Sequence, residues 1–549
     1  MHLPVNDHPI PEQPRPHRSV RRPWWRRLWF EIALGVVVAG CIALAVGSVY
    51  VSRHAGPILR RRIEETLAAR FHSPVELDSV DVSLMRGVEV RGHGLRVLYL
   101  AGPDVPDAAQ LAGSPVLKPM LVVKDFAFRT SLHDLLHLRT HIANVDVDGM
   151  KLHIPPHHGM HIEQTNTHSV ERLILDSIVC KDAKIVIETD KPGKEPLEFD
   201  IQNLVLTNVS SHQPFRFTAD LINPKPVGDI HASGTFGPWQ GADPRDTPVD
   251  GQYSFSNADL GTIKGISGTL SSTGNFSGKL GHIMVDGVTH TPNFALDISD
   301  HPLPLETQFH AIVDGTNGDT TLAPVNARLL HTNFSCSGVV ANIHGRGHDI
   351  SLDVTMPAGR MEDLLTLALK SKQPLMTATI AMHAKLHIPP GPERVPAKIE
   401  LAGDATLHGI DFTNPEVQDK IDALSMRAQG HPKDAGAAGS DGKPEVASTL
   451  MANFSFANEQ ATFSSVQFTV PGAQLQLAGF FAVPGERFDF KGNVRTDATA
   501  SQMTTGWKAL LLKPVDPFLK KNGAGLQLPI EISGTKDNVH FGLDLGSKK

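Results

Sequence analysis

Apolar and polar residues alternate along most of this chain, which is the pattern of β-strands with one apolar face. Clear examples are the runs at residues 215–221 and 526–532. Roughly 30 such runs of about five to nine residues follow one another, separated by Gly, Asn, Asp or Pro. The run that reaches Val90 is expected to break at Gly92 and Gly94. The alternation predicts a mainly β protein.

Helical spacing is confined to short segments. Residues 56–71 place Leu59, Ile63, Leu67 and Phe71 at every fourth position, which predicts an amphipathic helix. Strands do not alternate with long helices, so a doubly wound parallel sheet is not expected. Further helix-like spacing occurs at residues 131–138, 361–371, 415–424 and 502–512.

The end of the chain predicts a β-hairpin. Two alternating runs, residues 526–532 and 539–545, flank the segment from Gly534 to Asn538. That segment is rich in turn-forming residues, so we expect it to be the hairpin loop.

Residues 32–51 form an apolar stretch without a charged side chain. A helix of about 20 residues spans roughly 30 Å, the thickness of the hydrocarbon core of a bilayer. We therefore predict one transmembrane helix at residues 28–51. Arginines before it place the N-terminus in the cytoplasm. Aromatic residues that favour the membrane–water interface flank the stretch, namely Trp24, Trp25, Trp29 and Tyr50.

Two processing alternatives stay open for this segment. Ala43, Leu44 and Ala45 fit the small residue pattern of a signal-peptide cleavage site. The residues before Cys41 look like a lipobox, which would make Cys41 a lipidated N-terminus. The long N-terminal region and the apolar run after Cys41 favour a retained signal anchor.

Composition and motifs argue against several classes of function. The formal net charge of −7 disfavours nucleic-acid binding. The sequence has no G-x-S-x-G, Walker, H-E-x-x-H or dinucleotide-binding motif, and its three cysteines form no disulfide framework. His157 and His161 lie in a Pro- and Gly-rich stretch, and residues 314–319 are typical of a turn. We therefore expect no enzyme activity, no cofactor and no metal site.

Alternation alone leaves two architectures open. The apolar faces could bury one another in several β-sandwiches, or they could line the groove of one long curled sheet. Trp and Tyr are scarce outside the N-terminal segment, which counts against a carbohydrate-binding surface.

Several parts of the chain share one resemblance. They are the apolar anchor, residues 56–97, residues 409–430, residues 463–480 with Val-Pro-Gly-Ala at 470–473, and the closing segment 513–545. Together they resemble the AsmA-like family, inner-membrane-anchored periplasmic β-groove proteins related to TamB. The resemblance implies a transmembrane helix followed by an elongated, curled, mostly antiparallel β-sheet with a few short helices.

The resemblance also implies a function. A hydrophobic β-groove would bind or conduct phospholipid in the periplasm, in outer-membrane biogenesis, with other envelope proteins as further partners. The implied order is a cytoplasmic basic tail (1–27), transmembrane helix (28–51), amphipathic helix (52–74), β-groove (75–430), flexible loop (431–446) and C-terminal β part (447–549).

The closing hairpin supplies the candidate groove residues. Their apolar side chains would share one face near the distal end of the groove, and they are Leu526, Leu528, Ile530, Ile532, Phe541, Leu543 and Leu545. The alternative function is a periplasmic scaffold or assembly factor for outer-membrane β-barrel proteins, acting by strand pairing at a sheet edge.

Overall fold

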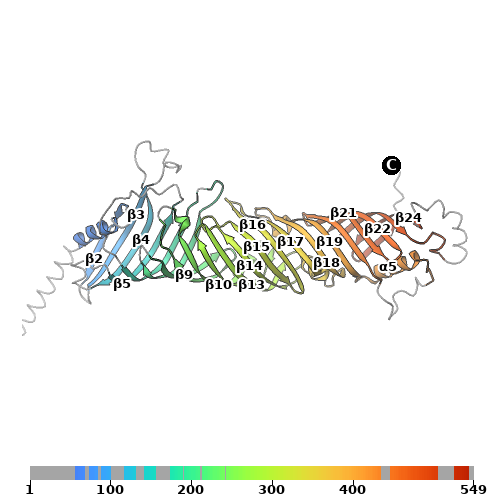
Figure 1. The fold of residues 1–549 in the computed structure, drawn as a ribbon, viewed down its shortest axis with the longest axis horizontal. Helices are drawn as coiled ribbons and strands as arrows, with labels where there is room; N and C mark the ends of the chain where they lie inside the picture. The colour runs from blue at the N-terminus through green and yellow to red at the C-terminus, as the bar shows by residue number, and fades with distance from the viewer. Residues whose placement is uncertain are drawn as a thin grey trace, which may run out of the picture.

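The protein is mainly β, and its strands join in one elongated sheet. The computed structural model describes residues 56–68, 73–83, 88–100, 117–130, 141–155, 174–189, 191–209, 213–240, 243–433, 446–504 and 525–542. These residues contain one 25-stranded sheet. Figure 1 shows that the sheet is a single curled layer, in which the chain advances from one end to the other. The apolar faces therefore line one curled sheet and do not form a series of sandwiches.

The strands fall into three parts along the sheet. The N-terminal part holds β1 (Val75–Glu76), β2 (Ser79–Ser83), β3 (Val88–Leu100), β4 (Leu117–Thr130), β5 (His141–Ile154), β6 (Ile174–Ile187), β7 (Leu197–Val209), β8 (Phe215–Pro224) and β9 (Val227–Phe236). The middle part holds β10 (Pro248–Asp259), β11 (Ile266–Ser267), β12 (Thr269–Lys279), β13 (His282–Leu296), β14 (Leu303–Val313), β15 (Thr320–Leu329) and β16 (Thr332–Ile343). The C-terminal part holds β17 (Gly347–Arg360), β18 (Met376–Ile388), β19 (Glu400–Phe412), β20 (Thr449–Ala457), β21 (Gln460–Val470), β22 (Ala473–Ala482), β23 (Arg487–Thr496), β24 (Leu526–Thr535) and β25 (Asn538–Gly542).

Neighbouring strands are antiparallel almost throughout. β1 and β2 both pair with β3, and the short β11 pairs with β13 beside the β12–β13 ladder. The exception is the parallel pair β5–β6, in which His141 lies opposite Ile174. Antiparallel pairs can be joined by short reversals, which suits a sequence of alternating runs separated by turn residues.

Several strands are longer than the alternation predicts, and the expected break after Val90 is wrong. β3 continues through Gly92 and Gly94 to Leu100. Gly92 is tolerated because the ring of Phe126 on the neighbouring strand lies over it. Gly94 has a φ of 68°, a left-handed conformation that bends the strand without ending it.

Three helices lie where helical spacing predicts them, at residues 56–68, in α3 (Met361–Ala368) and in α5 (Pro415–Ala428). The helix α4 (Val395–Lys398) and the two 3₁₀ turns, η3 (Pro244–Asp246) and η4 (Leu260–Thr262), were not predicted. α5 begins at Pro415 because the Asn414 side chain caps it, accepting a hydrogen bond from the Glu416 N–H at 3.0 Å. The expected helix at residues 131–138 lies outside the described residues. So do residues 505–512 of the helix expected at 502–512, whose first three residues form a turn and a bend.

The closing hairpin is confirmed, but its loop is shorter than the expected segment from Gly534 to Asn538. β24 and β25 are joined by Lys536 and Asp537 alone, because Thr535 already pairs with Asn538. In the described part of the chain, no helix is long and apolar enough to cross a membrane. The expected transmembrane helix at residues 28–51 lies outside that part, as do Cys41 and most of the expected loop at 431–446.

Candidate functional site: an apolar trough

One face of the curled sheet is apolar from the first strands to the last. Following the pairing from strand to strand gives an unbroken first row of side chains across the sheet. The first row is Val80, Gly92, Phe126, Val147, Cys180, Leu204, Ala219, Ala232, Tyr253, Gly274, Gly287, Phe309, Val325, Cys336, Val354, Ala384, Gly403, Phe454, Phe463, Gly479, Phe490, Ile532 and Phe541.

A second row lies beside the first and contains no polar side chain. It is offset by two residues along each strand except β15, where a register shift makes the step from Val325 to Leu322 three residues. Its members are Val82, Val90, Phe128, Val145, Ile178, Leu206, Phe217, Gly234, Gly251, Phe276, Val285, Ala311, Leu322, Gly338, Leu352, Leu386, Leu401, Phe456, Ala461, Phe481, Phe488, Gly534 and Val539. We call the face that carries both rows the apolar trough.

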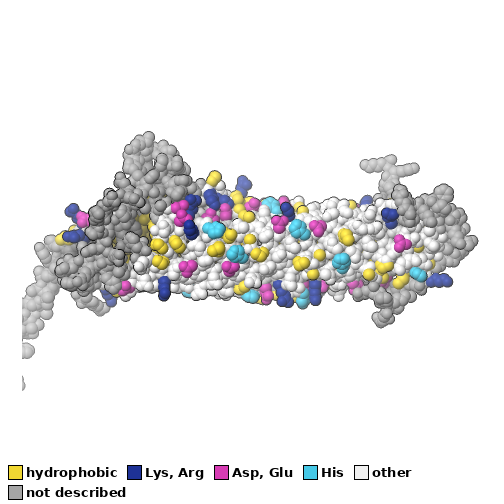
Figure 2. Space-filling view, viewed as in Figure 1, with side chains coloured by type: hydrophobic (Ala, Val, Ile, Leu, Met, Phe, Trp, Pro, Cys, Tyr) yellow, Lys and Arg dark blue, Asp and Glu magenta, His cyan; other side chains and the backbone are white. Residues whose placement is uncertain are grey.

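The opposite face is polar. On β10, Gln252 is exposed next to the partly buried Tyr253, and on β13 Asp286 is exposed next to the partly buried Gly287. Because successive side chains of a strand point to opposite faces, this difference shows that the curl shields the trough side. In Figure 2 the visible surface carries scattered charged, histidine and hydrophobic side chains among white atoms, which belong to other side chains and the backbone.

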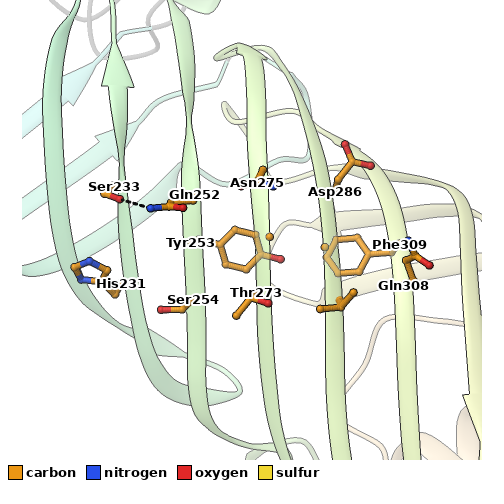
Figure 3. Close-up of a pocket in the computed structure, with 13 residues that line it drawn as sticks. His231, Ser233, Gln252, Tyr253, Ser254, Thr273, Asn275, Asp286, Gln308 and Phe309 are labelled. Atoms are coloured by element: carbon orange, nitrogen blue, oxygen red, sulfur yellow. Dashed lines mark hydrogen bonds between the residues drawn. The ribbon is translucent and has the colours of Figure 1, made fainter.

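Glycine pairs lower the floor of the trough in the middle part. Gly274 lies opposite Gly287, and the ring of Tyr253 lies over Gly274, with its Cε1 atom 2.8 Å from the place of a Cβ. Phe309 covers Gly287 in the same way, with its Cζ atom 2.7 Å from that place. Figure 3 shows both rings lying across the neighbouring strands toward these glycines. A cavity of about 580 Å³ borders the same strands, but most of its lining side chains, such as Gln252, Thr273 and Asp286, belong to the opposite, polar face.

The trough is covered to different extents along its length. In the C-terminal part, α5 packs Ala428 against Val470 and Ala473 in a large buried cluster. Toward the N-terminus, Leu59 of the helix at residues 56–68 packs on Val80. In the described part of β10 and β12–β14, no residue of the two rows belongs to a buried cluster. The middle of the trough is therefore the stretch whose row residues, among those described, belong to no buried cluster.

The curl brings opposite margins of the sheet together. One margin carries the chain reversals after β6, β10, β13, β17 and β19, and the other carries those after β14, β16, β18, β22 and β24. Lys194, after β6, pairs with Asp319, after β14, at 2.8 Å. Arg394, after β18, pairs with Asp297, after β13, at 2.9 Å. The Lys536 carbonyl, after β24, accepts a hydrogen bond from Asn414, after β19, at 3.2 Å.

These contacts bridge the trough at three places. The first bridge also includes Lys191 and Asp314, whose charged atoms lie 2.7 Å apart. Burial alone would raise the pKa of Asp314, but hydrogen bonds from Lys191 and Thr316 hold that pKa below its ordinary value. The carboxylate is therefore charged at neutral pH, as a bridge between margins requires.

Histidines of the polar face pair with carboxylates on neighbouring strands. His231 lies 2.6 Å from Asp220, and His387 lies 2.8 Å from Asp349 and 3.0 Å from Glu400. The hydrogen bonds that His387 donates to the carboxylates of Glu400 and Asp349 raise the pKa of its imidazole. Among the residues that the structure describes, no group of side chains is arranged to hold a metal ion.

The structure places five of the seven hairpin candidates. Leu526 is buried, and its alternate neighbours on β24 pack against the C-terminal cluster, namely Leu528, Ile530 and Ile532. Phe541 lies opposite Ile532, beneath the Lys420 ammonium, 4.7 Å from the ring centre. Leu543 and Leu545 lie outside the described residues, as do Trp24, Trp25, Trp29 and Tyr50.

Sequence reasoning missed the middle of the trough. Its signal was present, because Gly and an aromatic residue alternate with Ser, Thr, Asn or Gln at residues 251–255 and 273–276. Glycine weakens a strand, so these runs predict strands poorly by themselves. They are explained only by the pairing, which places an aromatic ring of the neighbouring strand over the glycine. Comparison with family models, curated proteins and solved structures finds no match to this chain. What the fold defines is a single curled β-sheet with one continuous apolar face.

Proposed function

We propose that this protein binds phospholipid in the apolar trough and conducts it along the sheet. The observation that carries the proposal is the pair of unbroken apolar rows, which contain no charged or amide side chain in the described residues from β2 to β25. Soluble proteins rarely leave so large an apolar surface without a ligand or partner. No bond is made or broken in this role, so the proposed activity is not enzymatic.

The dimensions of the trough suit acyl chains. Neighbouring strands are about 4.8 Å apart, so rows that cross the sheet from β2 to β25 extend for roughly 100 Å. One acyl chain needs about half of the ~30 Å hydrocarbon core of a bilayer. Each methylene group that leaves water contributes about 0.8 kcal/mol to the binding free energy of the acyl chain. Because the floor is uniformly apolar, this binding free energy would be similar at successive positions, so a bound chain could move along the trough.

The setting we propose follows the family resemblance. The chain would be an AsmA-like protein, anchored in the inner membrane by residues 28–51, with its sheet in the periplasm and a role in outer-membrane biogenesis. Two features support this setting: the apolar, Arg-flanked segment at residues 32–51 and the long curled sheet with its apolar face.

Site-specific photo-crosslinking in cells tests the proposal on the full chain. Val285 lies in the second row, and its neighbour Met284 is 41% exposed on the opposite face. A p-benzoylphenylalanine residue at Val285 should give phospholipid adducts, identified by mass spectrometry, because its ring lies in the trough. The same residue at Met284 should give none. Equal adducts at both positions, or none at Val285, would contradict the proposal.

A second candidate function rests on the C-terminal edge of the sheet. β25 pairs only with the segment from Glu531 to Thr535, so the first half of β24 has no strand on that side among the described residues. A scaffold for outer-membrane β-barrel proteins could pair a client strand there. Pro529 lacks an N–H donor, which limits such a ladder. Stoichiometric capture of an unfolded barrel strand, with no lipid adduct at Val285, would favour this function.

A further inference from the structure

A short row of hydroxyl groups interrupts the apolar surface in the middle of the trough. On the same face, next to the first row, Ser272 of β12 lies opposite Thr289 of β13, and Thr289 lies opposite Thr307 of β14. Phe255 precedes this row and Ala327 follows it, so apolar side chains flank it on both sides. We call Ser272, Thr289 and Thr307 the hydroxyl row.

Hydrogen bonding accounts for part of the hydroxyl row. Ser272 Oγ donates to the Val288 carbonyl at 3.0 Å, so the Tyr253 hydroxyl donates to Ser272 Oγ at 3.1 Å. Thr289 Oγ1 and Thr307 Oγ1 lie 2.6 Å apart, and only one of them can donate to the other. Among the described residues, the remaining hydroxyl hydrogen of this pair has no acceptor.

An unmet donor on an apolar surface favours a ligand that carries an acceptor within an apolar body. The ester carbonyl of an acyl lipid has this chemistry, whereas a phosphate group would require a cation. No Lys or Arg occurs in the first or second row of the described residues. Thr289 and Thr307 are partly exposed on the trough face, so a lipid in the trough would reach this pair, whereas Ser272 is buried.

We infer that the Thr289–Thr307 pair of the hydroxyl row binds an ester carbonyl oxygen of a diacyl lipid and makes a preferred position midway along the trough. This inference rests on the proposed function, because it concerns the part of the lipid that the trough recognises. The three residues lie on adjacent strands, about 4.8 Å from one backbone to the next. Thr289 Oγ1 and Thr307 Oγ1 lie only 2.6 Å apart, so their one remaining hydrogen is offered at a single point above the sheet. The acyl chains would extend over the rings of Tyr253 and Phe309.

Native mass spectrometry of the full-length chain in detergent tests the inference with two probes. One is dioleoyl phosphatidylcholine, which has ester linkages, and the other is the dioleyl ether analogue with the same headgroup. We expect the wild-type chain to bind the ester lipid about fivefold more tightly, the size of one hydrogen bond made in an apolar site. The double variant Thr289→Val and Thr307→Val should bind both lipids equally, because it keeps the shape and removes the hydroxyl groups.

Three control variants make the test specific. Thr273→Val removes a hydroxyl from the opposite, exposed face and should keep the ester preference. Thr289→Ser keeps the hydroxyl and should also keep the preference. Val285→Glu gives the background from lipids bound outside the trough.

The outcomes separate the two proposals. Equal binding of ester and ether lipids by the wild-type chain, above the Val285→Glu background, would overturn the hydroxyl row and leave the lipid trough intact. A preference that survives the double valine variant would also overturn it. No binding of either lipid above that background would overturn both.

Discussion

The middle of the trough and its C-terminal part have the same alternation of residues but different surroundings. Phe468 and Val470 are buried in the cluster that includes Ala428 of α5, at 6% and 2% exposure, whereas Tyr253, Phe276 and Phe309 stay partly exposed and belong to no buried cluster. A covered apolar face stabilises the fold, and an uncovered one remains available to a ligand. The comparison therefore separates the part of the trough that holds the sheet together from the part that would hold lipid.

We expect the largest effect on stability when a phenylalanine of the C-terminal part is replaced, and a phenylalanine of the middle part provides the comparison. Phe468→Ala should lower the free energy of unfolding by about 3–5 kcal/mol, because it opens a cavity under α5. Phe276→Ala, in the middle part, should cost about 1–2 kcal/mol, because its ring is already partly exposed. Urea unfolding followed by circular dichroism measures both. Equal losses would show that the middle part is as tightly packed as the C-terminal part.

A glycine substitution tests how closely the rings approach the floor. In Gly287→Ala the new methyl group would meet Phe309 Cζ and the Tyr253 hydroxyl, each at 2.7 Å. We expect a loss of about 1–3 kcal/mol in the free energy of unfolding. Gly542→Ala is the control, since nothing lies within 4 Å of its added Cβ. Two variants with the same urea midpoint would refute close packing of the rings.

The ion pair between Lys194 and Asp319, which joins the two margins, should contribute less to the free energy of unfolding than the buried cluster next to α5. Lys194 is 14% exposed and joins Asp319 across the sheet, so Lys194→Ala should cost about 1–2 kcal/mol. Lys279→Ala breaks a pair with Asp246 in which both side chains are more than half exposed, and it should cost less than about 0.5 kcal/mol. Urea midpoints distinguish the two variants. A larger loss for Lys279→Ala would contradict the bridge.

The smallest expected effect depends on pH. The raised pKa of His387 means that its ion pairs stabilise the fold fully below the ordinary histidine pKa, and less as pH rises through the folded-state pKa. His387→Gln should therefore lower the melting temperature at about pH 5.5 and change it less at about pH 8.5. His383→Gln is the control, because His383 lies on the same strand and makes no ion pair in the described part. A larger decrease in melting temperature at about pH 8.5 than at about pH 5.5 would contradict this prediction.

Local features of the fold were readable in advance, and long-range ones were not. The helix at α5 follows from Asn414 and Pro415, and the hairpin follows from two alternating runs around a turn. The parallel pair β5–β6 was not expected, because no sequence feature of either strand indicates which strand it pairs with or in which direction. For the site, the sequence pointed to β24 residues such as Leu528, while the hydroxyl row and the uncovered middle part were missed.

What the sequence by itself determined is the two-sided character of the strands. Alternation assigns Val285 and Met284 to opposite faces whichever strand lies beside them, because side chains on a strand have a period of two. Only the tertiary structure decided that Tyr253, Gly274, Gly287 and Phe309 fall in one row. It also decided that Lys194 meets Asp319, which lies 125 residues further along the chain. Register and curl depend on pairing, bulges and twist summed over many strands, and no local pattern contains that sum.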